Sequence, residues 1–120
     1  MTEKYFLDTY AILEIISGNA SYMKYEKTDA ILTKLNLFEL FYKILMLHGK
    51  EKAVKYTEKY SEFVIDYDIE VIDRAAILKL NNKNMSMTDC IGYILSLKYG
   101  VKFLTGDDAF RGMPNVEFLK

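Results

Sequence analysis

The sequence predicts an α/β protein in which helix, sheet and helix form three layers around a central, mainly parallel sheet of four to five strands. Short β-type runs alternate with longer segments whose apolar residues recur at helical spacing. Parallel strands need crossover connections, and helices between successive strands provide them. The chain has 120 residues, 51% of them hydrophobic, and a single proline. We therefore expect one globular domain over residues 1–120.

Turn and capping residues separate the expected elements in the first half of the chain. Ser17-Gly18-Asn19 closes the first helix, and His48-Gly49 closes a second helix with apolar residues at every third or fourth position. A polar helix rich in Lys and Glu follows it. The expected elements are a strand over residues 4–7, a helix over 9–16, a strand over 30–32, and helices over 36–47 and 51–60.

The second half of the chain continues the alternation of strands and helices. Asn81-Asn82-Lys83-Asn84 is a polar loop between two helices, and Gly100 ends the second of them. Thr105-Gly106-Asp107-Asp108 then ends a strand. The expected elements are strands over residues 63–65, 101–104 and 116–119, and helices over 69–80 and 86–99.

Charge and cysteine content limit the classes of function. The net charge is -1, without the basic excess that proteins binding long nucleic acids usually carry. The one cysteine, Cys90, excludes an intrachain disulfide and suits a reducing, cytoplasmic setting. No segment resembles a signal peptide or a membrane span, so we expect a soluble protein without a membrane partner.

Four acidic residues carry the functional prediction. Asp8 and Asp107 directly follow strands, and parallel sheets bind ligands beyond the carboxyl ends of their strands. Asp89 lies in the first turn of a helix, and Glu39 projects from a helix that we expect to be buried around most of its circumference. Carboxylates brought close together raise each other's pKa unless a cation offsets their repulsion. Such a site favours Mg²⁺ or Mn²⁺ and the hydrolysis of a phosphodiester by activated water.

Each of these acids also has a purely structural interpretation. Asp8 is placed to cap the helix that follows it, and Asp89 has the spacing of a capping box with a serine three residues earlier. Glu39 is placed to pair with Lys43 one helical turn further on. Asp107 or Asp108 is placed to cap the short turn that follows the strand. The case for a metal site therefore rests on the four acids together.

The four acids lie in four short segments spread over nearly the whole chain. The segments are Phe6-Leu7-Asp8-Thr9, Asn36-Leu37-Phe38-Glu39-Leu40, Met85-Ser86-Met87-Thr88-Asp89 and Leu104-Thr105-Gly106-Asp107. These segments resemble the four motifs of the PIN-domain family and occur in the family's order. The size is similar to that of the VapC toxins of type II toxin–antitoxin modules.

This resemblance implies an endoribonuclease that depends on Mg²⁺ or Mn²⁺. The toxin branch further implies a homodimer and a small antitoxin whose tail covers the acidic groove. Thr9 and Thr105 would be supporting hydroxyls, and Asp108 is an alternative to its neighbour as a ligand. The implied metal-binding and catalytic residues are Asp8, Glu39, Asp89 and Asp107.

Several alternatives stay open at this stage. A nuclease in RNA maturation or decay, or a catalytically silent binding module on the same fold, would carry the same motifs. Tyr22 and Tyr25 are candidates for stacking on a base or meeting a partner protein. The lysines that could form a basic rim for the RNA substrate are Lys24, Lys27, Lys34 and Lys102.

Overall fold

The computed structural model describes residues 3–120 and confirms the predicted α/β class. Its four strands form one sheet in the order β2-β1-β3-β4, and every neighbouring pair is parallel. Leu7 of β1 lies opposite Leu104 of β3, so the carboxyl ends of the two central strands are side by side. The strands are β1 (Lys4–Leu7), β2 (Asp29–Ile31), β3 (Lys102–Thr105) and β4 (Val116–Phe118).

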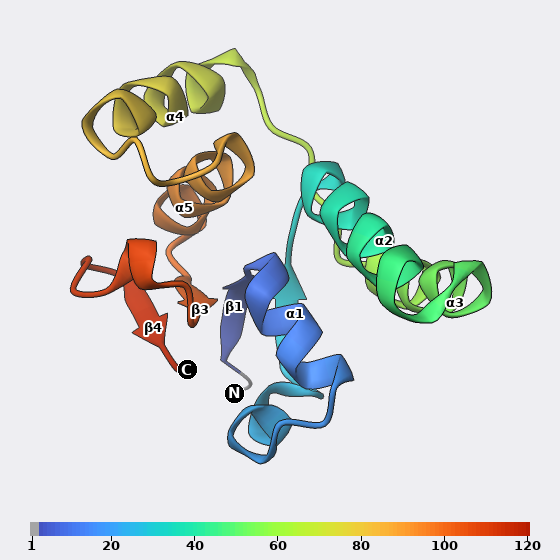
Figure 1. Cartoon of the computed structure of the whole chain (residues 1–120). Coiled ribbons are helices and arrows are strands. Elements are labelled where there is room, and N and C mark those ends of the chain that lie inside the picture. The colour runs from blue at the N-terminus through green and yellow to red at the C-terminus, as the bar shows by residue number, and fades with distance from the viewer. Residues whose placement is uncertain (1–2) are drawn as a thin grey trace.

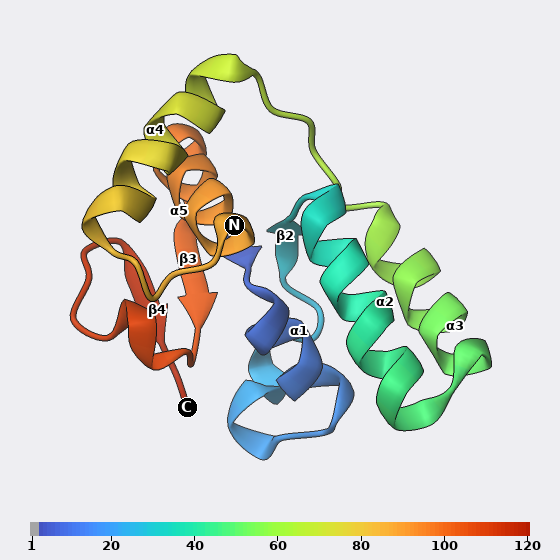
Figure 2. The ribbon, with the colours of Figure 1, turned by 45° about the horizontal axis from the view of Figure 1, so that its top comes forward.

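Helices cover both faces of this sheet, with α1 and α5 on either side of the central strands (Figure 1). The helix α4 packs on the outer side of α5, and the pair formed by α2 and α3 stands beside the β2 edge (Figure 2). These positions give the three layers expected from the sequence. The helices are α1 (Thr9–Ile16), α2 (Lys34–His48), α3 (Lys50–Ser61), α4 (Ile69–Asn81) and α5 (Met87–Tyr99), with 3-10 segments η1 (Ala20–Tyr25) and η2 (Asp108–Phe110).

Successive side chains of the central strands point to opposite faces of the sheet, so each face carries apolar residues that helices cover. Phe6 and Phe103 stack on each other, 5.5 Å between ring centroids, on the face that α5 covers. A Cβ atom at Gly92 of α5 would lie only 2.6 Å from the Phe6 ring, so a glycine lets this helix lie directly on the sheet. The preceding residue of β1, Tyr5, points to the opposite face and meets Tyr25 edge to face at 5.3 Å.

The short segment η1 corrects one expectation from the sequence. Tyr22 is 0% exposed and Tyr25 is 5% exposed, so neither ring is available to a base or a partner protein. The Tyr22 hydroxyl donates to the carbonyl oxygen of Leu119, and the Tyr25 hydroxyl donates to Glu117 Oε2 at 2.6 Å. The two tyrosines therefore connect η1 to β4 and its end through the core.

The expected strand over residues 63–65 is also wrong, since this segment forms only an isolated parallel bridge between Leu32 and Val64. Leu32 donates its N–H to Phe63 and accepts one from Ile65, at 3.1 and 2.9 Å. The next residue, Thr33, is already the N-cap of α2. Leu32 is therefore the only residue that pairs with residues 63–65, and a single pair does not make a strand.

The packing of α2 differs from the prediction as well. This helix buries only Asn36, Leu40 and Ile44, whereas Phe38 is 74% exposed and Leu47 is 70% exposed. Its contacts are with α1 and α3, which cover one side of the helix. Apolar residues on the remaining side face solvent. Within residues 3–120, no helix is both long and apolar enough to cross a bilayer.

Candidate active site

Three of the four predicted acids meet at the carboxyl edge of the sheet. Asp8 follows β1, Asp107 follows β3, and Asp89 lies in the first turn of α5. Each offers a carboxylate oxygen, and these oxygens all lie within 4.8 Å of one another. Glu39 is outside this group of three but lines the same pocket, which has a volume of about 340 Å³. We call this hollow the acidic pocket.

Helix capping fixes the orientation of the three aspartates. Asp8 accepts the N–H of Thr9 at 2.8 Å as the N-cap of α1. Asp89 and Ser86 form the predicted capping box, with two hydrogen bonds of 3.0 Å. Asp107 accepts an N–H of η2 at 3.0 Å. The structural interpretation is therefore confirmed for these acids, but each cap uses only one carboxylate oxygen.

Thr105 joins two of the aspartates from within the core. Its hydroxyl donates to Asp8 Oδ2 at 2.6 Å and accepts the N–H of Asp107 at 3.0 Å. Its side chain is fully buried, so the two hydrogen bonds are shielded from water. A Cβ atom at Gly106 would collide with the Leu119 carbonyl and the Tyr10 ring. The turn after β3 therefore needs a glycine to bring the following aspartate into the site.

A series of side-chain hydrogen bonds from α1 and α2 holds Glu39 at the pocket. Thr9 donates its hydroxyl to Glu39 Oε1 at 2.8 Å and accepts the amide N–H of Asn36 at 3.2 Å. Asn36 in turn accepts the Thr33 hydroxyl at 2.8 Å in the capping box of α2. No role was predicted for Asn36, although the Thr-x-x-Asn spacing is a recognisable capping signal.

Two expectations about Glu39 are corrected by these contacts. The side chain is half-buried and not enclosed, because α2 exposes most of its surface. Among the described residues Glu39 forms no ion pair with Lys43. Its carboxylate instead accepts the hydroxyl of Thr9, which also lines the acidic pocket.

Burial and mutual repulsion disfavour the charged forms of the central acids. Burial, followed by the charge of Asp89, raises the pKa of Asp8 to about 8, against the opposing hydrogen bonds from Thr105 and Thr9. Burial also raises the pKa of Asp89, and the charge of Asp107 adds to the effect. A divalent cation would remove this penalty, and closely spaced carboxylate oxygens are the hard donors that Mg²⁺ and Mn²⁺ prefer. The donor set therefore fits the predicted metal.

Asp108 lies apart from the three clustered aspartates. It is exposed and pairs with Arg111 at 2.8 Å and with Lys120 at 2.6 Å. The hydrogen bonds from Lys120 and Arg111 lower the pKa of its carboxyl group. The structure thus brings Asp107, and not Asp108, together with Asp8 and Asp89.

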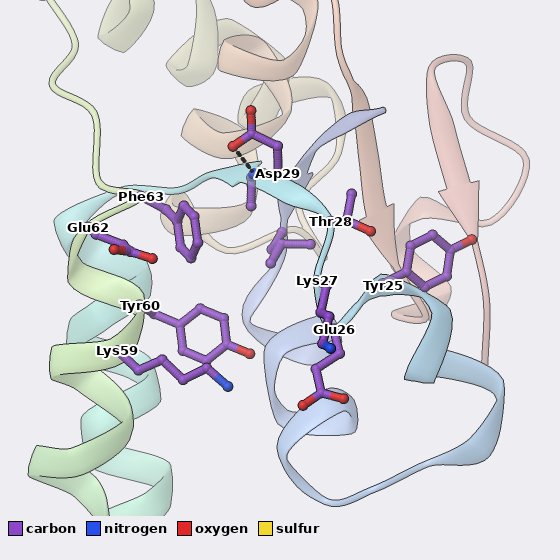
Figure 3. A pocket seen from close by; sticks show the side chains of 11 residues that line it. Tyr25, Glu26, Lys27, Thr28, Asp29, Lys59, Tyr60, Glu62 and Phe63 are labelled. Atoms are coloured by element: carbon purple, nitrogen blue, oxygen red, sulfur yellow. Dashed lines mark hydrogen bonds between the residues drawn. The ribbon is translucent and has the colours of Figure 1, made fainter. Parts of the chain in front are cut away.

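None of the lysines suggested as a basic rim lines the acidic pocket. Lys102 begins β3, at the end of the strand opposite the acids, and Lys34 lines an apolar groove on α2. Lys27 lines a separate pocket of about 470 Å³ between the start of β2 and the end of α3 (Figure 3). That pocket mixes acidic and basic side chains and holds none of the predicted site residues. The Tyr60 hydroxyl in its wall is buried without a hydrogen-bond partner among the described residues.

Comparison with known proteins agrees with this geometry. Among curated proteins, none matches the chain in sequence. A toxin–antitoxin complex from Klebsiella pneumoniae contains a chain of the same fold, with a TM-score of 0.72 and 17% identity over 96% of this chain and 95% of that chain. VapBC2 from Rickettsia felis, bound to a DNA fragment from its promoter, has a TM-score of 0.71 and 16% identity over 98% of this chain and 97% of that chain.

DNA-bound VapBC from Salmonella typhimurium likewise gives a TM-score of 0.71 and 16% identity over 99% of this chain and 98% of that chain. At such identities the solved structures establish the fold alone. The PIN-domain family, in contrast, matches the sequence itself over residues 5–116, which includes all four acids and the turns that position them. The chain belongs to the PIN-domain family.

Proposed function

We propose that this chain is a divalent-metal-dependent endoribonuclease and that residues 1–120 act as a single nuclease domain. The observation that carries the proposal is the set of three carboxylates within 4.8 Å of one another in a PIN-domain chain. The pKa values of Asp8 and Asp89 are raised, so the charged form of the site is unfavourable without a bound cation. Hydrolysis of an RNA phosphodiester is the chemistry that this donor set supports best.

Each role in this proposal belongs to a side chain with a defined position in the structure. Asp8, Asp89 and Asp107 would hold Mg²⁺ or Mn²⁺, and Glu39 would act as a fourth carboxylate from the α2 side of the pocket. Such an ion lowers the pKa of water and polarises a phosphoryl group. Thr105 orients Asp8 through its 2.6 Å hydrogen bond. Hydrogen bonds of this kind typically change metal affinity by about 10- to 100-fold.

The toxin–antitoxin complexes that share the fold support a proposal about partners. We propose that the chain is the toxin of a toxin–antitoxin pair, acting on RNA in the cytoplasm and forming a homodimer. An apolar groove of about 540 Å³ on α2 and α3 includes the exposed Phe38, the residue before Glu39, and offers room for an antitoxin segment. A second apolar groove of about 310 Å³ between α4 and α5 offers a surface for another copy of the chain.

An RNA-cleavage assay tests the central proposal. Single-stranded RNA is incubated with the wild-type chain in Mn²⁺, in Mg²⁺ and in EDTA, and with the variants Asp8→Asn and Asp89→Asn. We expect cleavage in either metal, none in EDTA, and loss of cleavage in both variants. Asp108→Asn is the matched control, because it removes an acid that lies outside the pocket.

Three outcomes would contradict parts of the proposal. Cleavage that persists in EDTA or in Asp8→Asn would exclude the carboxylate mechanism. RNA binding without cleavage would favour a catalytically silent binding module. Cleavage that no small partner protein inhibits, with products restricted to one precursor RNA, would favour a role in RNA maturation or decay.

A further inference from the structure

Among the described residues that line the acidic pocket, Lys43 is the only basic one. The same lining carries four carboxyl groups, from Asp8, Glu39, Asp89 and Asp107. An RNA strand bears one negative charge at each phosphate, so this surface repels the substrate. One bound divalent ion offsets only two of the four carboxylate charges. A cation at the rim is therefore needed to make the approach of a second phosphate favourable.

The position of Glu39 leaves the Lys43 ammonium group available. A glutamate and a lysine four residues apart on a helix usually pair with each other. Here the Glu39 carboxylate instead accepts a 2.8 Å hydrogen bond from the Thr9 hydroxyl. Lys43 itself forms no ion pair with any residue in the range 3–120 and is exposed on α2.

The charge of the whole chain makes a local contact more important. With a net charge of -1, the protein has no general electrostatic attraction for a polyanion. Affinity for RNA must then come from cations placed where the strand passes. A lysine suits this task, because its compact ammonium group sits on a flexible stem of four carbons.

We propose that Lys43 is a substrate-positioning residue that binds the RNA phosphate next to the scissile phosphodiester. This inference rests on the proposed nuclease function. Lys43 acts on the strand and not on the reacting atoms, so its loss weakens substrate binding and leaves the chemical step nearly intact. Arginine preserves the positive charge at this position and preserves most of the function.

Steady-state cleavage of a single-stranded RNA oligonucleotide in Mn²⁺ tests this role. We compare the wild-type chain with Lys43→Gln, Lys43→Arg and Lys34→Gln. Lys34 is the matched control, because it is the other lysine of the same helix and lines a different groove. For Lys43→Gln we expect KM to rise about 10-fold and kcat to change less than about threefold, with recovery in Lys43→Arg.

Salt dependence provides a readout that a structural role would not change. One lost contact to a single-stranded phosphate should reduce the slope of log(kcat/KM) against log[salt] by about 0.7. An unchanged KM and slope in Lys43→Gln, or an equal effect in Lys34→Gln, would overturn the proposal. A fall in kcat at constant KM would also overturn it, by placing Lys43 in the chemical step.

A binding measurement separates this proposal from the nuclease function. Fluorescence anisotropy of labelled single-stranded RNA is measured in Ca²⁺ with the wild-type chain and with Lys43→Gln. If the wild type binds RNA in Ca²⁺ but does not cleave it in Mn²⁺, the nuclease proposal fails and the positioning role fails with it, and about 10-fold weaker binding by Lys43→Gln would then show only a phosphate contact. If the wild type cleaves and both chains bind alike, the role of Lys43 fails alone. If the wild type neither cleaves nor binds, both fail.

Discussion

Replacing Asp8 by Asn should stabilise the metal-free protein. At pH 7 the solution is about 3.2 pH units above the ordinary pKa of 3.8, whereas the pKa of this buried carboxyl is about 8. The folded chain must therefore keep Asp8 protonated, at roughly 1.4 kcal/mol for each of those pH units, or about 4 kcal/mol. Asn is neutral and still caps α1. Because Asp89 remains in the site, we expect a gain of about 2 to 4 kcal/mol.

The pH dependence has a defined sign. The pKa of Asp8 is higher in the folded state, about 8, than its ordinary value of 3.8, so the folded state binds more protons between these values. The stability that Asp8 contributes is therefore complete below about pH 4 and is lost as the pH rises toward about 8. In Asp8→Asn this fall in stability with pH should be much smaller.

Thermal unfolding in EDTA at several pH values measures both effects. A gain of 2 kcal/mol corresponds to a rise in Tm of roughly 8 °C for a domain of this size. Asp108→Asn is the control, because the pKa of this exposed acid is lowered by Lys120 and Arg111 and its loss should not raise the Tm. An unchanged or lower Tm in Asp8→Asn would show that burial and the neighbouring aspartates do not penalise the Asp8 carboxylate in the folded chain.

Three further substitutions test the surroundings of the site. Thr105→Val removes the donor to Asp8 and leaves the Asp107 N–H unpaired, so denaturant unfolding should show a loss of about 1 to 3 kcal/mol; equal stability would mean that these hydrogen bonds contribute nothing. Glu39→Gln keeps an acceptor for the Thr9 hydroxyl, so RNA cleavage should fall at least about 10-fold while the Tm stays within about 2 °C; full activity would remove Glu39 from the site. Tyr60→Phe deletes a buried hydroxyl without a partner, so the free energy of unfolding should be unchanged or rise by about 1 kcal/mol; a clear loss would reveal an unseen partner in the pocket of Figure 3.

Local signals in the sequence predict most of the architecture. The turn residues and caps around α1 and α5 lie where the pattern places them, because a glycine or a capping serine acts on its own segment of chain. The failure over residues 63–65 has a different origin. A β-type run becomes a strand only if the segment beside it stays extended long enough to pair. Here the neighbouring segment ends at Leu32, because Thr33 is already the N-cap of α2.

Glu39 shows a second limit of sequence patterns. The apolar composition of α2 indicates a buried helix, but composition does not distinguish a core face from a face reserved for a partner. The structure leaves Phe38 exposed on this helix. The case for Glu39 now rests on its hydrogen bond to Thr9 and its place in the acidic pocket, and not on burial.

The choice between Asp107 and Asp108 illustrates a third limit. Two adjacent aspartates after a strand are equivalent in any spacing argument. The contacts that separate them come from elsewhere, because Thr105 holds one near Asp8 while Lys120 and Arg111 hold the other in solvent. Such side-chain pairings are set by tertiary structure, so the sequence alone left both residues as candidates.

Helix capping and metal binding are compatible roles for the same aspartate, because a carboxylate has two oxygens. Asp8 gives one oxygen to the N–H of Thr9 and the other to the Thr105 hydroxyl, which fixes the direction in which its remaining lone pairs point. Asp89 is fixed in the same way by the capping box at the start of α5. Substitution by Ala would remove the cap and the charge together, whereas Asn keeps the cap and removes only the charge. Variants with Asn therefore isolate the electrostatic role of the three aspartates, and a loss of cleavage combined with a gain in Tm is the result that a metal site predicts.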